Sequence, residues 1–188
     1  MHVLLLDIDG TLLSSGGAGQ AAMEAALERE FGAVRPIEGI AYAGRTDHAI
    51  TRDLFDYYAL EQTAERRSRF QQTYFQLLPQ YLSQREGSIL PGVLELLELL
   101  TTRDDIAVGL LTGNFRHGAG LKLRHYAIDH HFTFGGYGDE HHDRDDVARE
   151  ALRQAEAKVG RDAIDDVWVI GDTPADVRCA RAIRAKVL

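Results

Sequence analysis

The chain has 188 residues, with 21 lysines and arginines against 29 aspartates and glutamates, so its formal net charge is −8. This acidic balance excludes a general nucleic-acid binder, which needs a basic surface to replace the counterions of the phosphate backbone. The single cysteine, Cys179, excludes a disulfide framework and indicates a reducing compartment. The first apolar run, residues 3–6, is too short for a signal peptide or a membrane span, so we expect a cytoplasmic protein without a membrane partner.

Short apolar runs without polar alternation predict strands that are buried on both faces of a parallel sheet. The chain has four of them, at residues 3–6, 106–111, 131–134 and 167–170. Between these runs, apolar residues at helical spacing predict helices that start at Pro91, span 145–159 and start at Pro174. Strands and helices that alternate in this way form a doubly wound, Rossmann-like α/β sheet with right-handed crossovers.

The stretch between residues 14 and 87 interrupts this alternation, because it contains no convincing strand. Apolar residues at helical spacing predict three helices there instead. They cover residues 23–31, 50–58 and 70–81. A proline lacks the backbone N–H that a helix interior uses, so we expect Pro79 to kink or end the third helix.

These patterns predict two structural units. Residues 1–13 and 88–188 would form a discontinuous α/β core, and residues 14–87 would form an inserted, all-helical cap domain. The final residues, 185–188, begin another buried-strand pattern that stops at once, which suggests that the native fold continues beyond Leu188.

Polar clusters directly follow three of the predicted strands. They are Asp7 with Asp9, Thr112 with Gly113, and Asp172 with Asp176. Because the carboxyl ends of parallel strands meet at one edge of a sheet, we expect these side chains to converge. A turn or a helix cap explains any single cluster equally well, and it is the coincidence of three that favours a functional site.

The residue types in these clusters suit phosphate chemistry. Asp7 and Asp9 are two residues apart in extended backbone and point into one small volume, where one can act as a nucleophile and the other as a general acid and base. Together with Asp172 they form an all-oxygen donor set, which suits Mg²⁺ better than zinc. Thr112 and Gly113 offer a hydroxyl and backbone N–H groups between a strand and a helix, an arrangement that binds phosphate.

The same segments resemble motifs one, two and four of the haloacid dehalogenase-like hydrolase superfamily. They are Asp7-Ile8-Asp9-Gly10-Thr11, Thr112-Gly113-Asn114 and Gly171-Asp172-Thr173-Pro174-Ala175-Asp176. The helical insert after the first motif is similar to the class 1 cap of that family. Residues 44–47, Gly-Arg-Thr-Asp, resemble a segment that is common in phosphoglycolate phosphatase-like members.

The resemblance implies a Mg²⁺-dependent phosphatase that acts on a small phosphorylated metabolite. Asp7 would attack the phosphorus and form an aspartyl phosphate, and Asp9 would protonate the leaving oxygen and later activate water. Thr112 would bind the transferring phosphoryl group. The metal ligands would be Asp7, the Asp9 carbonyl, Asp172 and, directly or through water, Asp176. The dehalogenases of the family lack a carboxylate at the position of Asp9, which favours a phosphatase here.

Motif three of the family is normally a lysine, and this chain departs from that pattern. The best-placed cation is Arg144, whose guanidinium can bridge phosphate and carboxylate. Lys122 is the alternative, although its position suggests an exposed helix lysine. Arg45, in a loop of the insert, would meet a substrate carboxylate or a second phosphate, unless it forms a surface salt bridge. The other motif residues are expected to contact the substrate: Gly10, Thr11, Gly113 and Asn114.

Other functions remain open at this point. A nucleotidase, a sugar phosphatase or a mutase would share every core residue, although sugar phosphomutases of this family often carry valine where this chain has Thr11. A non-catalytic phosphate-binding or interaction protein on the same scaffold is the competing class. The chain is expected to be a monomer or a homodimer.

Overall fold

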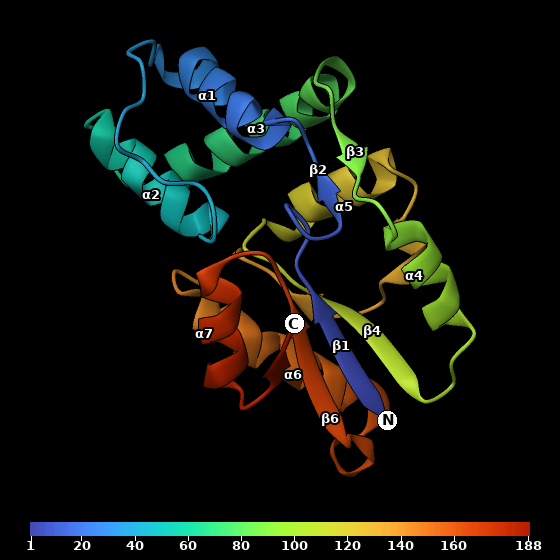
Figure 1. The fold of residues 1–188 in the computed structure, drawn as a ribbon. Coiled ribbons are helices and arrows are strands. Elements are labelled where there is room, and N and C mark those ends of the chain that lie inside the picture. The colour runs from blue at the N-terminus through green and yellow to red at the C-terminus, as the bar shows by residue number, and fades with distance from the viewer.

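The computed structural model describes residues 1–188 and has a five-stranded parallel sheet at its centre (Figure 1). The strand order is β5-β4-β1-β6-β7, and every neighbouring pair is parallel. The strands are β1 (His2–Leu6), β4 (Ile106–Leu111), β5 (Gly135–Gly136), β6 (Asp166–Ile170) and β7 (Lys186–Val187). The expected doubly wound α/β fold is therefore confirmed, and the carboxyl ends of its strands share one edge.

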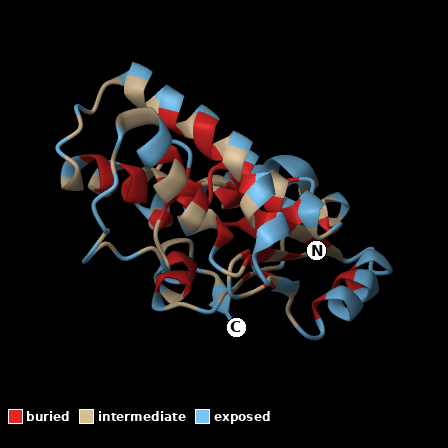
Figure 2. Cartoon of the chain, turned by 90° about the horizontal axis from the view of Figure 1, so that it is seen from above, coloured by how far each residue is buried: buried red, intermediate tan, exposed pale blue.

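Helices cover both faces of this sheet, so the core has three layers. On one face lie α6 (Arg144–Val159) and α7 (Pro174–Ala182). On the other lie α4 (Val93–Thr101) and α5 (Arg116–His125). Figure 2 shows the buried residues concentrated where the elements face one another. None of the helices is both long and apolar enough to span a membrane.

The strand predicted at 131–134 is wrong in position. Asp129–His131 form a 3₁₀ turn, and the strand that pairs with β4 consists of Gly135 and Gly136. These glycines are needed for close packing, because a Cβ on Gly136 would lie 2.3 Å from the Val147 carbonyl oxygen of α6. A search for apolar runs does not recognise a strand without side chains.

Three helices follow β1 and form what we call the helical insert: α1 (Ala18–Phe31), α2 (Asp47–Tyr57) and α3 (Ala64–Gln84). The chain enters it through β2 (Leu13–Ser14) and leaves it through β3 (Ser88–Ile89), and these two strands pair antiparallel. Figure 1 shows the insert beyond the carboxyl ends of the sheet strands. The two connections thus form one two-stranded ribbon between the insert and the sheet.

Helix α3 continues through Pro79 to Gln84, so of the two expected effects the end of the helix at this proline is wrong. Pro79 is exposed, and the helix loses the one hydrogen bond that its missing N–H would make. On the opposite face of the same helix, Tyr74, Leu78 and Leu82 are buried in the core of the insert. Burial of this face outweighs the loss of one exposed hydrogen bond.

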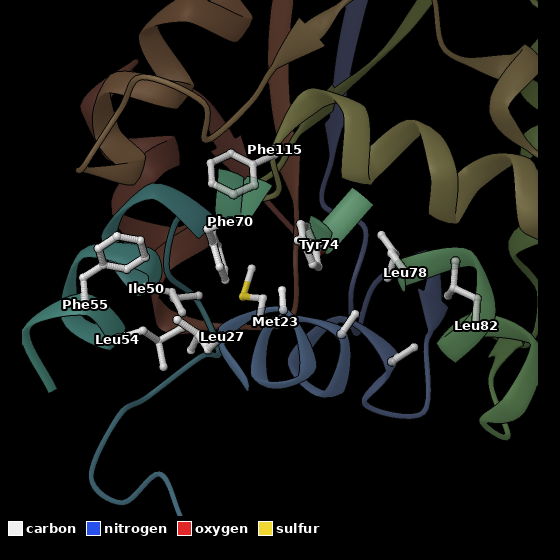
Figure 3. Packing of buried hydrophobic residues seen from close by; sticks show 13 residues of the cluster. Met23, Leu27, Ile50, Leu54, Phe55, Phe70, Tyr74, Leu78, Leu82 and Phe115 are labelled. Carbon is white, nitrogen blue, oxygen red and sulfur yellow. The ribbon is translucent and has the colours of Figure 1, made fainter. Parts of the chain in front are cut away.

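The apolar core of the insert extends into the sheet domain (Figure 3). Leu27 of α1, Ile50 of α2 and Phe70 of α3 pack in one cluster, and Phe115, just before α5, points into it. The Phe115 ring lies edge-on to Tyr74, with 6.3 Å between the ring centroids. The insert is therefore held against the loop that follows β4.

Candidate active site

Loops at the carboxyl edge of the sheet bring the predicted acidic residues together. Asp7 directly follows β1, and its N–H donates to the carbonyl of Ile170 at the end of β6, at 3.0 Å. Asp172 and Asp176 follow β6, and their carboxylate oxygens and one of Asp7 all lie within 4.8 Å of one another. Side chains that are about 165 residues apart in the chain thus meet at one point.

A buried guanidinium lies among these carboxylates. Arg144, the first residue of α6, is 6% exposed. Its Nη2 donates to Asp176 Oδ1 at 2.6 Å, and its Nη1 donates to Asp7 Oδ2 at 3.4 Å. A cation between two buried carboxylates offsets part of their mutual repulsion. Of the two candidates for the motif three cation, Arg144 is the one in contact with Asp7.

Lys122, the other candidate, contacts Asp9 instead. Its Nζ donates to Asp9 Oδ2 at 2.6 Å and to Asn114 Oδ1 at 2.7 Å. Lys122 is only 4% exposed, so the expectation of an exposed helix lysine is wrong. Its face of α5 lies against the insert, where a Cβ on Gly19 would be 3.5 Å from Nζ. The lysine is buried because the insert covers it.

The two carboxylates of the first motif differ in pKa. Burial raises the pKa of Asp7 to about 6; the Arg144 guanidinium opposes this shift, and the Asp176 carboxylate adds to it. Burial acts on Asp9 as well, but the charge and hydrogen bond of Lys122 outweigh it and hold the pKa of Asp9 below its usual value. Asp9 is therefore ionised at neutral pH, and a divalent cation beside Asp7 would favour its ionised form.

The acidic cluster fits a hard divalent cation. Asp7, Asp172 and Asp176 offer only oxygen donors, and a single buried cation, Arg144, is shared by Asp7 and Asp176. Asp172 is exposed, and one oxygen of Asp7 accepts no hydrogen bond from another side chain. Both oxygens of Asp176 are engaged, Oδ1 by Arg144 and Oδ2 by the N–H and hydroxyl of Thr173. Asp7 and Asp172 are thus the side chains that could bind Mg²⁺ directly.

Two further residues of the first motif lie beneath Asp172. Gly10 has a φ of +85°, and a Cβ on it would lie 2.3 Å from Asp172 Oδ2. Thr11 donates from Oγ1 to Asp172 Oδ1 at 3.4 Å. The turn after Asp9 therefore needs glycine both for its backbone conformation and for the close approach of Asp172.

In the second motif, the threonine and the asparagine have different surroundings. Thr112 is completely buried, and its hydroxyl accepts a hydrogen bond from the Asn114 side chain at 2.8 Å. Asn114 also donates to Asp9 Oδ2 at 2.8 Å. Gly113 and Asn114 line the cleft between the sheet edge and the helical insert, and Thr112 does not. The Gly113 N–H has no partner within the protein and is available to an anion.

A cleft of about 240 Å³ lies between the sheet edge and the helical insert. The core side of the cleft consists mainly of Asp7, Asp9, Asn114, Lys122, Arg144 and Asp172. The insert side consists mainly of Met23, Tyr42, Arg45, Asp47, Ile50 and Tyr74. A cavity of this size admits a small molecule.

Arg45 and Asp47 bring opposite charges to the insert side of the cleft. Arg45 donates to Asp53 Oδ2 at 2.7 Å. Of its two expected roles, a contact with substrate or a salt bridge, the structure has the salt bridge. The sequence places Asp47 at the end of the Gly-Arg-Thr-Asp segment, and it is not among the expected site residues. Its N–H donates to the Gly113 carbonyl at 2.7 Å, and its Oδ2 accepts from the Phe115 N–H at 2.8 Å. Asp47 thus ties α2 to the loop after β4.

Asp47 is expected to make stability depend on pH. Burial raises its pKa to about 7, although the Lys122 charge opposes this shift. A carboxyl with a raised folded-state pKa stabilises the fold fully below its unfolded value of about 4, and this contribution is lost as the pH rises through about 7. We therefore expect Asp47→Asn to raise the free energy of unfolding, and to do so more at pH 8 than at pH 5.

Urea unfolding of both proteins at both pH values measures this difference. The contributions of other titrating groups, such as Asp7, to the free energy of unfolding cancel when the variant is compared with the unchanged chain at the same pH. An equal effect of the substitution at the two pH values would contradict the prediction.

The fold is shared with several solved structures. A hydrolase from Pseudomonas syringae is 23% identical, with a TM-score of 0.70 over 100% of this chain and 83% of that one. A predicted phosphoglycolate phosphatase from Haemophilus somnus is 17% identical, with a TM-score of 0.69 over 98% and 83%. CbbY from Rhodobacter sphaeroides, solved in complex with phosphate, is 15% identical, with a TM-score of 0.71 over 98% and 84%. Among curated proteins, none matches the chain.

The family comparison agrees with the three motifs of the sequence. A model described as haloacid dehalogenase-like hydrolase matches residues 4–181. This range includes both units of the structure and all the residues that meet at the sheet edge. Because nearly the whole chain is matched, the resemblance of the motifs reflects membership, and the chain belongs to the haloacid dehalogenase-like hydrolases.

Proposed function

We propose that this hydrolase is a Mg²⁺-dependent phosphatase that cleaves phosphate monoesters of small metabolites through an aspartyl-phosphate intermediate. The observation that carries the proposal is the position of Asp7, which lies beside Asp172 and Arg144 at the sheet edge of a small cleft. CbbY, which has the same fold, was solved with phosphate, and a mutant of it was solved with xylulose-1,5-bisphosphate. Phosphate esters therefore bind to at least one protein of this architecture.

Asp7 and Asp9 divide the chemistry between them. The Asp7 carboxylate attacks the phosphorus, the ester P–O bond breaks, and the leaving oxygen keeps the electron pair of that bond and takes a proton from the minor protonated form of Asp9. Water then attacks the phosphorus of the aspartyl phosphate, and Asp9 accepts the proton of that water. Inorganic phosphate leaves and Asp7 is regenerated. The ionised state that Lys122 maintains on Asp9 is the one needed in this second step.

Charge compensation comes from the surrounding groups. Mg²⁺ would be held by Asp7, Asp172 and the Asp9 carbonyl, and it would supply the positive charge that lets a phosphate dianion approach an ionised carboxylate. Arg144 orients Asp7, and the free N–H of Gly113 donates to a phosphoryl oxygen. Phosphoryl transfer depends mainly on such positioning and neutralisation of charge.

The helical insert acts as a cap in this proposal. Residues 14–87 cover the leaving group and exclude water, and residues 1–13 and 88–188 hold the groups that react. The cleft lies between these two parts, and Phe115 and Asp47 connect them across it.

Metal dependence is the direct test of this function. With Mg²⁺ present, the chain is expected to release inorganic phosphate from a panel of small phosphate monoesters that includes p-nitrophenyl phosphate. Excess EDTA is expected to lower the rate by at least about 100-fold, and added Mg²⁺ to restore it, because a bound metal supplies several kcal/mol of charge stabilisation. Colorimetric phosphate release measures both effects. No release from any ester by a folded chain would favour the non-catalytic binding protein.

A further inference from the structure

Every cationic side chain that lines the cleft is already paired with a carboxylate. The pairs are Lys122 with Asp9, Arg144 with Asp7 and Asp176, and Arg45 with Asp53. The shortest N···O distances in these three groups are 2.6, 2.6 and 2.7 Å. A carboxylate or a second phosphate of a substrate would therefore have to compete with a protein carboxylate for any cation of the cleft.

Asp47 differs from these groups because part of its carboxylate has no partner. Its Oδ2 accepts from the Phe115 N–H, whereas its Oδ1 accepts no hydrogen bond from the protein. The side chain lines the cleft and is only 7% exposed, and Oδ1 is not among the fully enclosed atoms. An almost buried carboxylate oxygen without a donor is unfavourable, so a ligand that brings a donor to it gains binding energy.

Apart from Asp47 and the paired Arg45, the main groups on the insert side of the cleft are neutral. Met23 and Ile50 are apolar, and the hydroxyl groups of Tyr42 and Tyr74 have no hydrogen-bond partner in the protein. Gly19 leaves space here, since a Cβ on it would come within 3.9 Å of the Tyr74 hydroxyl. This surface can pair with hydroxyl groups and with short carbon chains.

We infer that the leaving group of the substrate carries hydroxyl or ammonium donors and no negative charge, and that Asp47 recognises it. The inference rests on the proposed function, because it concerns the part of the cleft beyond the phosphate. A leaving group with a carboxylate, such as that of phosphoglycolate, would meet the ionised form of Asp47 above pH 7, in a desolvated site whose cations are all paired. A leaving group with donors satisfies Oδ1 and can pair with the Tyr74 hydroxyl, which unlike that of Tyr42 is not fully enclosed.

The first test compares matched esters on the unchanged, Mg²⁺-loaded chain at pH 8, where Asp47 is ionised. Glycerol 3-phosphate presents hydroxyls, phosphoethanolamine presents an ammonium, phosphoglycolate presents a carboxylate, and p-nitrophenyl phosphate serves as the general substrate. We expect kcat/KM for glycerol 3-phosphate, phosphoethanolamine or both to exceed that for phosphoglycolate by at least about tenfold. The ratio of the first two shows which donor Asp47 prefers.

The outcomes separate this inference from the proposed function. An equal or higher kcat/KM for phosphoglycolate overturns the inference and leaves the phosphatase intact. If none of the four esters is hydrolysed, the proposed function fails and the inference fails with it.

A substitution at Asp47 tests its role. Asp47→Asn keeps the shape of the side chain and an oxygen for the Phe115 N–H, but it turns a donor toward the cleft. The preference over phosphoglycolate is expected to fall by about tenfold. Asp56→Asn removes an acidic group from an exposed position on the same helix, and its preference should equal that of the unchanged chain. Equal preferences in all three proteins overturn the role of Asp47, and thermal unfolding shows whether each variant is folded.

Discussion

Asp7→Asn is expected to lower the hydrolysis of phosphate monoesters by at least about 1,000-fold, because an amide cannot attack phosphorus and no aspartyl phosphate forms. The substitution preserves shape, and the amide oxygen still accepts from Arg144 Nη1. It also removes one of the carboxylates that share the Arg144 charge, so the free energy of unfolding should not fall. A lost activity in a folded protein therefore reports the loss of the Asp7 carboxylate, as nucleophile and as metal ligand, and not a loss of structure.

Two measurements check this result. Steady-state phosphate release compares the variant with the unchanged chain, and mass spectrometry after acid quenching detects the phosphoryl group on the unchanged chain only. Asp56→Asn, which alters an exposed carboxylate outside the cleft, serves as the matched control and should retain full activity. Turnover by Asp7→Asn close to that of the control would mean that another residue is the nucleophile.

Arg144→Ala is expected to reduce the free energy of unfolding by about 3–5 kcal/mol, in addition to abolishing activity. The guanidinium is the only side-chain cation in contact with Asp7 and Asp176, which are 5% and 0% exposed. Without it, two carboxylates remain buried and uncompensated. Arg144→Lys should recover part of the stability, because an ammonium pairs with one of the two carboxylates but not with both.

Lys122→Ala provides the comparison for this prediction. Lys122 is also buried, but the side chain of its partner Asp9 is 40% exposed, so water can solvate the carboxylate once the ammonium is gone. Urea unfolding at pH 7 should therefore show a smaller loss for Lys122→Ala than for Arg144→Ala. Equal losses would contradict the view that Arg144 is the central cation of the buried cluster.

The acidic cluster of the core could be predicted from the sequence because it follows from strand geometry. Asp7 and Asp172 each come directly after an apolar run, and parallel strands must bring such positions to one edge. The same reasoning yielded β1, β4 and β6 within one residue of their observed ends. It failed at β5, whose glycines carry no apolar pattern to recognise.

The insert side of the site could not be predicted in the same way. The burial of Lys122 and the free oxygen of Asp47 depend on how α1 and α2 pack against the loop after β4, and no local pattern encodes that packing. Within the core, the surroundings of Thr112 could not be predicted either. Its motif suggests a contact with phosphate, and in the structure its hydroxyl accepts a hydrogen bond from Asn114. Contacts between the two units therefore required the three-dimensional structure.

The ribbon of β2 and β3 brings both ends of the helical insert to adjacent points, with Leu13 opposite Ile89. A segment whose ends are already held together can change in length or sequence at little entropic cost to the rest of the chain. The register of β1 with β4 and β6 is set by other residues, and so is the position of Asp7. Evolution can therefore replace the helical insert, which we propose selects the substrate, as one segment. The sheet that positions Asp7 would remain unchanged.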